Sequence, residues 1–291
     1  MKDNRALALI LLIILAMIWG SSFILIKKGL VGLTPQELAS LRIVAASVVL
    51  IPFAITRIKR VEKANWKFLL SVGFAGSLIP AFLFALAQTQ LESAVVGILN
   101  ALVPLFTVII AGAFYGHKHQ FQVYGGVMVG LVGSIVLILA GNSGAIGGFN
   151  PYLLLIVLAT IFYAINLNLI KEHLQNLKSL TITSISLMLV GPIAAFYLFF
   201  LTSFPTKIVS DEEIFWPVIY IITLGVMGTS VALIIFNQVV RMTNPVFTSS
   251  VTYLIPVVAV GWGLIDGESL AIMHYLGMAL IFSGVYLANR R

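Results

Sequence analysis

The sequence predicts an all-α membrane protein in which ten transmembrane helices form two inverted five-helix repeats. Three observations support this fold class. Of the 291 residues, 60% are hydrophobic and only 9% are charged, whereas soluble domains carry about 25% charged residues. Ten apolar runs approach or reach the roughly 20 residues that a membrane-spanning helix needs. Two of these runs also read as copies of each other, which indicates an internal duplication.

The ten expected helices follow one another with little chain between them. They cover approximately residues 6–26, 38–56, 68–87, 94–115, 122–141, 151–170, 180–201, 215–237, 246–265 and 271–288. The longest polar insert runs only from Thr202 to Ile214. No segment is long enough to fold as a soluble domain, so we expect the function to lie within or across the bilayer.

The first expected span has an alternative interpretation. Lys2 and Arg5 precede an apolar core, as they do in a secretory signal peptide. Cleavage would remove the repeat partner of span six, so a first transmembrane helix is the preferred interpretation.

The clearest duplication joins Ser93–Tyr115 to Pro245–Gly267. Pro104 then superposes on Pro256 at an offset of 152. Other landmarks align on both sides at similar offsets. Any two apolar helices share some resemblance, but several aligned landmarks favour a true repeat.

We therefore divide the chain into a first repeat, residues 1–145, and a second repeat, residues 146–291. Because each contains an odd number of spans, the second must enter the membrane upside down relative to the first. With the N-terminus inside, 13 of the 17 basic residues fall on the cytoplasmic side. They are Lys2, Arg5, Arg57, Lys59, Arg60, Lys63, Lys67, Lys118, Lys171, Lys178, Arg241, Arg290 and Arg291. The positive-inside rule thus predicts that both termini are cytoplasmic.

The net charge of +7 is explained by this orientation signal. The basic cluster from Arg57 to Lys67 also suits anionic lipid headgroups. The charge therefore requires no nucleic-acid partner. The absence of cysteine excludes disulfides and thiol chemistry.

Polar side chains concentrate in spans one, three, four, six, eight and nine. A polar group within the bilayer needs a protein or water partner, so we expect these helices to line a central cavity. The candidate substrate-binding residues are Trp19, Ser22, Gln88, Asn100, Tyr163, Asn166, Thr229, Thr252 and Tyr253. For Trp19 and Tyr253, packing between helices is the alternative to stacking on a substrate.

Pro104 and Pro256 are the hinge candidates. Each removes a backbone donor and tends to kink its helix. The alternative is a kink that only helps packing, which is less expected for a pair at equivalent repeat positions.

Spans five and ten carry small residues in place of polar ones. Faces of small residues let helix backbones approach closely, so we interpret these spans as scaffold. Gly126 and Gly130 form a GxxxG pair, which alone supports a monomer or at most a weak homodimer.

Ionisable groups are almost absent from the expected spans. Arg42 lies about a turn inside span two, where snorkelling to the outer surface or a structural carbonyl contact is favoured over binding a substrate carboxylate. Glu268 and His274 flank the last loop and are expected to be solvated. His117 and His119 supply too few ligands for a metal site, and no cofactor is implied.

The chain resembles the drug/metabolite transporter superfamily, specifically the ten-helix permeases built from two EamA domains. The resemblance covers nearly the whole length. It rests on Trp19 to Phe23, Arg42, Ala94 to Pro104, Asn244 to Pro256, and Gly267-Glu268 followed by Gly277. One departure is Gly116-His117, where the family often has a second glycine-glutamate pair.

The resemblance implies a multi-pass carrier of the bacterial cytoplasmic (inner) membrane, often an exporter of amino acids, related metabolites or amphipathic drugs. From the residues we expect a small amphipathic solute such as an amino acid, moved by alternating access. A multidrug or cationic-dye efflux carrier is the alternative. A membrane enzyme is not expected, because no reactive constellation lies inside a span, and a non-transporting receptor or scaffold is the remaining rival.

Overall fold

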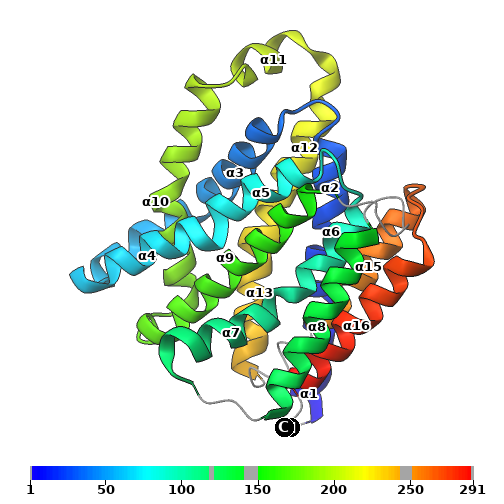
Figure 1. The fold of residues 1–291 in the computed structure, drawn as a ribbon. Helices are drawn as coiled ribbons and strands as arrows, with labels where there is room; N and C mark the ends of the chain where they lie inside the picture. Colours follow the sequence, from blue (N-terminus) through cyan, green and yellow to red (C-terminus); the bar gives the residue numbers. More distant parts are fainter. Residues whose placement is uncertain (1, 118–120, 141–149, 243–250, 290–291) are drawn as a thin grey trace.

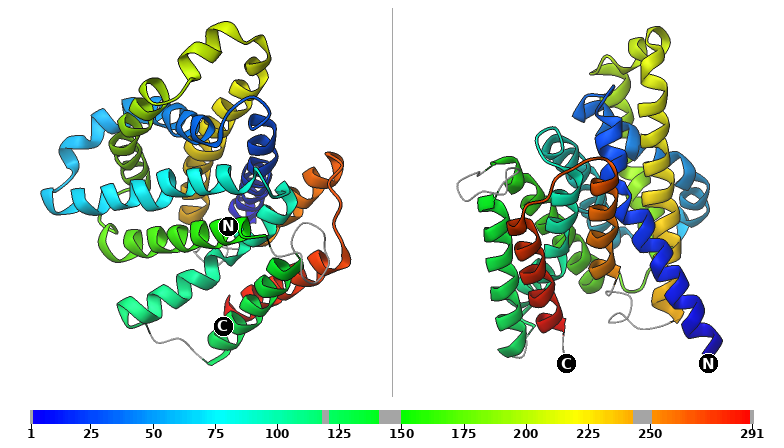
Figure 2. Two further views of the ribbon diagram at one scale, coloured as in Figure 1. Left: turned by 45° about the horizontal axis from the view of Figure 1, so that its top comes forward. Right: turned by 90° about the vertical axis from the view of Figure 1, so that its right-hand side faces the viewer.

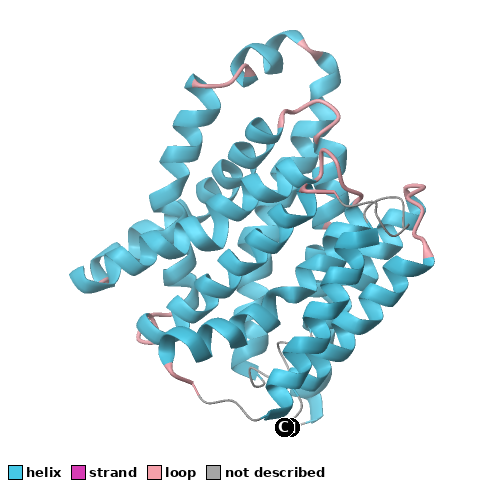
Figure 3. Ribbon diagram, viewed as in Figure 1, coloured by secondary structure: helices cyan, strands magenta, loops and turns pink. Residues whose placement is uncertain are grey.

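The structure is a computed structural model that describes residues 2–117, 121–140, 150–242 and 251–289. Every regular element within these ranges is helical (Figure 3). The all-α prediction is therefore confirmed for the described part of the chain.

The first half of the chain supplies five expected spans, three of which are interrupted (Figure 1). The elements are α1 (Lys2–Gly20), α2 (Ser22–Gly29), α3 (Pro35–Arg57), η1 (Ile58–Arg60), η2 (Lys63–Asn65), α4 (Trp66–Gly73), η3 (Phe74–Leu78), α5 (Ile79–Ala87), α6 (Ser93–Leu99), η4 (Asn100–Leu102), α7 (Val103–Tyr115) and α8 (Phe121–Ala140).

The second half repeats this order and adds a short helix in its longest polar insert. Its elements are α9 (Tyr152–His173), α10 (Ser179–Phe200), α11 (Phe204–Ser210), η5 (Glu212–Ile214), α12 (Phe215–Thr223), η6 (Leu224–Val231), α13 (Ala232–Met242), α15 (Val251–Ile265) and α16 (Ile272–Asn289).

Seven helical stretches in the described residues are long and apolar enough to cross a membrane. They correspond to expected spans one to four and six to eight. Shorter apolar helices at 121–136, 254–265 and 272–284 coincide with expected spans five, nine and ten. The length and apolar composition of these helices thus indicate a helical membrane protein.

Helices from the two halves pack against each other throughout the bundle. α8 lies along α16, α3 along α10, and α6 along α15 (Figures 1 and 2). The described chain ends at Lys2 and Asn289 lie at one end of the bundle, and α11 lies at the opposite end (Figures 1 and 2).

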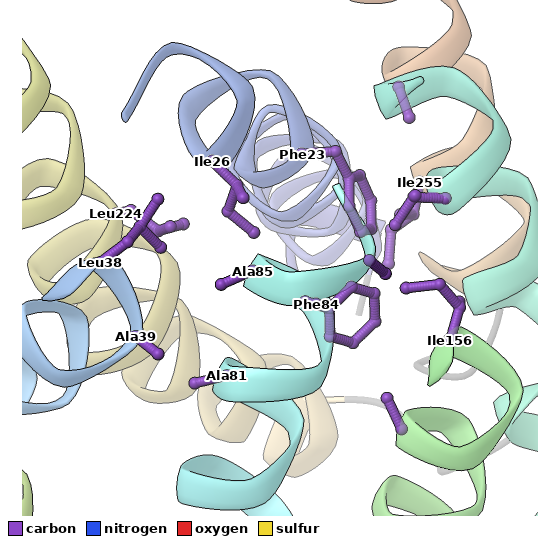
Figure 4. Packing of buried hydrophobic residues seen from close by; sticks show 14 of the residues in the cluster. Phe23, Ile26, Leu38, Ala39, Ala81, Phe84, Ala85, Ile156, Leu224 and Ile255 are labelled. Carbon is purple, nitrogen blue, oxygen red and sulfur yellow. The ribbon is translucent and has the colours of Figure 1, made fainter. Parts of the chain in front are cut away.

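The hydrophobic core lies between the halves. Figure 4 shows Phe23 of α2, Phe84 of α5, Ile156 of α9 and Ile255 of α15 meeting in its centre. Burial of apolar surface supplies little drive between helices inside lipid, so close packing of such side chains is what holds the bundle together.

Spans three and eight each contain a π-helical segment in the middle of an α-helix. These are η3 and η6, which begin at Phe74 and Leu224. π-Helical segments widen the helix by one residue per turn and occur frequently at functional sites. Both segments lie at the same place in their half of the chain, although nothing in the apolar pattern predicted them.

The two proline-containing spans differ in shape. In span four the α-helix gives way to the 3₁₀ segment η4, and Pro104 lies in the first turn of α7. In span nine Pro256 lies inside the continuous helix α15. Both helices end at a glycine with positive φ, 69° at Gly116 and 84° at Gly267, a conformation that glycine adopts without a steric penalty.

Candidate substrate site

A cation and an aromatic side chain lie near each other on two facing helices. Arg42 of α3 lies close enough to Tyr163 of α9 for its charge to act on the phenol. Arg42 as a whole is partly exposed, so the expectation that its long side chain snorkels to the outer surface stays a prediction. The Nε of Arg42 is buried and has no hydrogen-bond partner.

Aromatic rings continue from Tyr163 toward span one. The ring centroids of Tyr163 and Phe84 are 5.9 Å apart, and those of Phe84 and Phe23 are also 5.9 Å apart. Figure 4 shows Phe23 and Phe84 side by side in the core. Three helices thus contribute one continuous apolar wall that ends at a guanidinium.

Asn166 lies one turn beyond Tyr163 on the same face of α9. Its side-chain Oδ1 is buried without a hydrogen-bond partner. The backbone of the π-helical segment η3 passes directly beside it, because a Cβ added to Gly76 would lie 2.7 Å from the Asn166 side chain.

A second unpartnered amide lies in the 3₁₀ segment of span four. The Oδ1 of Asn100 is buried and lacks a partner, and its segment η4 packs against α9. Buried side-chain oxygens are nearly always hydrogen-bonded. Asn100 and Asn166 therefore retain acceptor capacity that a ligand or water can use.

Trp19 and Ser22 form a different wall of the interior. Trp19 Nε1 donates to the backbone oxygen of Gly228 at 2.9 Å, and Ser22 Oγ donates to that of Ile18 at 3.2 Å. Gly228 belongs to the π-helical segment η6, where Thr229 is also buried. The donors of this wall are already used within the protein.

Gln88 lies one turn beyond Phe84, directly after the last residue of α5. Its Nε2 donates to the backbone oxygen of Phe23 at 2.8 Å, and its Oε1 is buried without a partner. Thr252 and Tyr253 belong to α15, but their side chains lie outside the described residues. Tyr163 and Asn166 thus lie one turn apart on α9, and Arg42, which is not among the candidate residues, lies near Tyr163.

Two hollows lie away from this cluster. One, of about 250 Å³, lies between α1–α2 and α12–η6 and is lined by residues that include Met17, Ser21 and Met227. The other, of about 550 Å³, is formed by α11, η5 and the start of α12. Neither includes Tyr163 or Asn166, so a midplane cavity stays a prediction.

Glu268 joins three segments at the end of α6 where that helix begins. Its carboxylate accepts hydrogen bonds from the backbone N–H groups of Ser93 and Ala94, both at 2.9 Å, and from Ser93 Oγ at 2.7 Å. It also pairs with Lys27 Nζ at 2.8 Å, and Lys27 and Lys28 both pair with Asp266. Glu268 thus caps the N-terminus of α6, where an acidic group is favoured.

The expectation that Glu268 and His274 are solvated is wrong. Glu268 is only 6% exposed and His274 only 1%. Burial alone would raise the pKa of Glu268, but hydrogen bonds from Lys27, Ala94 and Ser93 outweigh it and hold the pKa below its usual value. The sequence carries no signal for this burial, because a glycine followed by an acid does not show which helix N-terminus lies nearby.

Glu92 has the opposite electrostatic environment. Burial, together with repulsion from the nearby Glu268 carboxylate, raises the pKa of Glu92. Its Oε2 is buried without a hydrogen-bond partner. The N-terminus of α6 therefore has one stabilised carboxylate beside it, Glu268 from the loop after α15, and one destabilised carboxylate, Glu92 from the loop before α6.

A second buried carboxylate joins the halves at Glu37. Glu37 forms a capping box with Thr34 at the start of α3 and accepts hydrogen bonds from Ser203 Oγ at 3.0 Å and Lys207 Nζ at 2.9 Å.

At the other end of the bundle, His117 Nε2 lies 3.2 Å from Glu172. His117, expected in a solvated loop, thus contacts the end of span six.

The small-residue faces of spans five and ten meet each other, as expected of a scaffold. A Cβ added to Gly284 would lie 2.3 Å from the backbone nitrogen of Gly130 and 2.6 Å from the backbone oxygen of Gly126. The GxxxG pair is therefore used inside the chain, between α8 and α16.

Comparison with known proteins agrees with this architecture. The EamA-like transporter family matches the chain twice, at residues 6–139 and 150–290. The chain is 28% identical to the Escherichia coli K12 protein named "Uncharacterized inner membrane transporter YedA", over 94% of this chain and 88% of that protein.

Two further comparisons extend over nearly the full length. An Escherichia coli K12 protein named "Probable amino-acid metabolite efflux pump" is 24% identical, over 96% of this chain and 93% of its own length. A chain in a crystal structure superposes with a TM-score of 0.64 at 17% identity, covering 97% of this chain and 96% of that one. At this identity the superposition shows a shared fold.

Proposed function

Because the chain belongs to the EamA-like transporter family, which matches both of its halves, we propose that it exports a small amphipathic metabolite by alternating access. An amino acid or a related compound is the substrate we favour. Membership of this family identifies the chain as a membrane transporter. The substrate class and the direction of transport are our proposal.

The observation that carries the proposal is the pair of buried, unpartnered amide oxygens of Asn100 and Asn166. They lie on helices that pack against each other, beside a helix interrupted at Gly76 by a π-helical segment. Irregular backbone and free polar groups deep in a membrane protein are expected where a solute or water passes. Trp19, Ser22, Gln88, Tyr163, Thr229, Thr252 and Tyr253 complete the proposed substrate-binding set.

The repeat organisation supplies the proposed motion. We propose that residues 1–145 and 146–291 are inverted repeats that rock about the shared core. Their contacts support this, because α1 packs against α15 as α9 packs against α7, and α3 packs against η6 as α10 packs against α4. Pro104 and Pro256 are the proposed hinges, and the charge distribution supports cytoplasmic termini in a bacterial inner membrane.

Two observations bear on the alternatives. A relative bears a name that refers to amino-acid metabolite efflux, which favours that substrate class over drugs. The cation Arg42 near Tyr163 disfavours a cationic dye because like charges repel. A non-transporting receptor or scaffold would not explain why these buried amide oxygens lack hydrogen-bond partners.

Reconstitution into proteoliposomes tests the proposal. Labelled amino acids and a cationic dye are offered with and without a proton gradient, and empty liposomes are the control. We expect the reconstituted protein to exchange at least one labelled amino acid across the membrane faster than empty liposomes do. Transport of the dye alone would support the drug-efflux alternative, and no transport of any compound would support the receptor or scaffold.

A further inference from the structure

We propose that Arg42 binds the carboxylate of the transported solute, which makes the substrate class a small monocarboxylate with an apolar side group. This inference rests on the proposed function and deepens it. It assigns to one residue the charge recognition that the amide oxygens do not provide.

The position of Arg42 is the first argument. α3 begins at Pro35, so Arg42 lies ~10 Å along the helix from its outer end at 1.5 Å per residue. Its side chain then reaches Tyr163, which lies near the middle of α9. A long basic side chain near a helix end ordinarily extends to the headgroups, whereas the Nε of Arg42 is buried.

The charge of Arg42 is the second argument. Each ion pair found in the described residues involves Lys27, Lys28, His117 or Lys207, all near the ends of spans. None joins Arg42 to a carboxylate. A guanidinium keeps its charge in proteins, and a charge inside the membrane region is costly unless an anion or polar groups compensate it.

The free hydrogen-bonding capacity is the third argument. The buried Nε–H of Arg42 donates no hydrogen bond. A guanidinium binds a carboxylate through two parallel N–H···O bonds. A carboxylate seated on Arg42 would therefore supply both the missing charge and the missing acceptor.

The neighbours of Arg42 define the rest of the solute. The rings of Tyr163, Phe84 and Phe23 form an apolar wall that begins at the guanidinium. One turn from Tyr163, the free Oδ1 of Asn166 can accept a hydrogen bond from an ammonium or amide group. One guanidinium balances a single negative charge, so a phosphate dianion or a polyanion fits poorly.

The experiment compares each neutral amino acid with its own carboxamide. Alanine, leucine and phenylalanine and the three amides are tested on wild-type protein for competition in proteoliposome flux and for a shift in the melting temperature of purified protein. We expect the acids to be favoured over the amides by about 30-fold or more, which corresponds to loss of one partner from a buried charge pair.

Variants of α3 identify the residue responsible. Arg42→Gln is expected to lose the preference for acids, and Arg42→Lys, which keeps the charge, to retain part of it. Arg57→Gln is the matched control, because Arg57 is exposed at the other end of α3 and donates only to Phe53 and Thr56 of the same helix. It should keep the wild-type preference.

The outcomes separate this inference from the function on which it rests. A wild-type protein that transports amino acids but treats acids and amides alike overturns the inference and leaves the carrier intact. An Arg42→Gln variant that still prefers acids to amides would also overturn the inference and leave the carrier intact. If no acid or amide crosses the membrane or shifts the melting temperature of the wild type, both proposals are wrong. The acid–amide comparison on wild type remains decisive if Arg42→Gln fails to fold.

Discussion

The carboxylate of Glu268 accepts a hydrogen bond from the backbone N–H of Ser93 at 2.9 Å, across 175 positions of sequence. One loop of the second half thereby caps a helix of the first half. The contact also brings span one into the cluster through Lys27. Glu268 therefore connects α2, α6 and the loop after α15 through one carboxylate.

Replacing that carboxylate tests this connection. Glu268→Gln should destabilise the purified protein by about 1–3 kcal/mol at neutral pH, because the buried carboxylate loses its charge-assisted hydrogen bonds. The pKa of Glu268 is lowered in the folded protein. Its stabilisation is therefore complete above the unfolded value of about 4.3 and is lost as the pH falls through the lowered folded value. Melting curves of wild type and variant should converge on acidification.

Glu92→Gln is the matched control for Glu268→Gln. The pKa of Glu92 is raised by burial and by the neighbouring carboxylate, so its charged form opposes folding at neutral pH. The substitution should leave the melting temperature unchanged or raise it. Equal losses from both substitutions would show that Glu268 has no special role.

Contact between α8 and α16 gives a second prediction. Gly284→Ala places a Cβ within 2.6 Å of three backbone atoms of Gly126 and Gly130, whereas a Cβ on Gly125 meets nothing within 4 Å. Backbone cannot move aside as a side chain can, so Gly284→Ala should cost about 1–3 kcal/mol. Gly125→Ala should be neutral or slightly stabilising. Thermal unfolding in detergent measures both, and similar melting temperatures would contradict the close helix contact.

The sequence predicts most of the fold but less of the site. Apolar length predicts the spans, because lipid demands an apolar segment whose backbone groups are hydrogen-bonded within the protein wherever the chain crosses. The direction of Arg42 is not predictable this way, since its flexible side chain can reach either the headgroups or Tyr163. Burial of Glu268 is missed for a similar reason, because it depends on which helix N-terminus lies opposite the loop.

Substitutions of two asparagines on α9 should distinguish an effect on substrate binding from an effect on stability. Asn166→Ala should raise the KM for transport about tenfold or more while leaving the melting temperature unchanged, because its Oδ1 has no partner to lose. Asn168→Ala should instead lower stability by about 1–2 kcal/mol, because Asn168 Nδ2 donates to the backbone oxygens of Thr107 and Ala164. Flux and melting measured on both variants check the distinction. Normal flux from Asn166→Ala would remove Asn166 from the site.

The prolines give a prediction about rate. Pro104→Ala and Pro256→Ala should lower the turnover rate without weakening substrate affinity, because restored backbone hydrogen bonds stiffen the helices that are proposed to bend. Pro52→Ala is the matched control, since Pro52 also lies inside a helix but is exposed on the bundle surface. Equal turnover in all three variants would assign the kinks to packing alone.

The central claim is a substrate site at Asn166 that opens to each face of the membrane in turn. The chain contains no cysteine, so Asn166→Cys introduces the only thiol into an otherwise native protein. Its reaction with a membrane-impermeant thiol reagent is measured in right-side-out and inside-out vesicles, with Val209→Cys, at a position 87% exposed on α11, as the one-sided control. We predict modification from both faces, slowed by the transported amino acid. A thiol at position 166 that reacts from neither face, while Val209→Cys reacts, would contradict the claim.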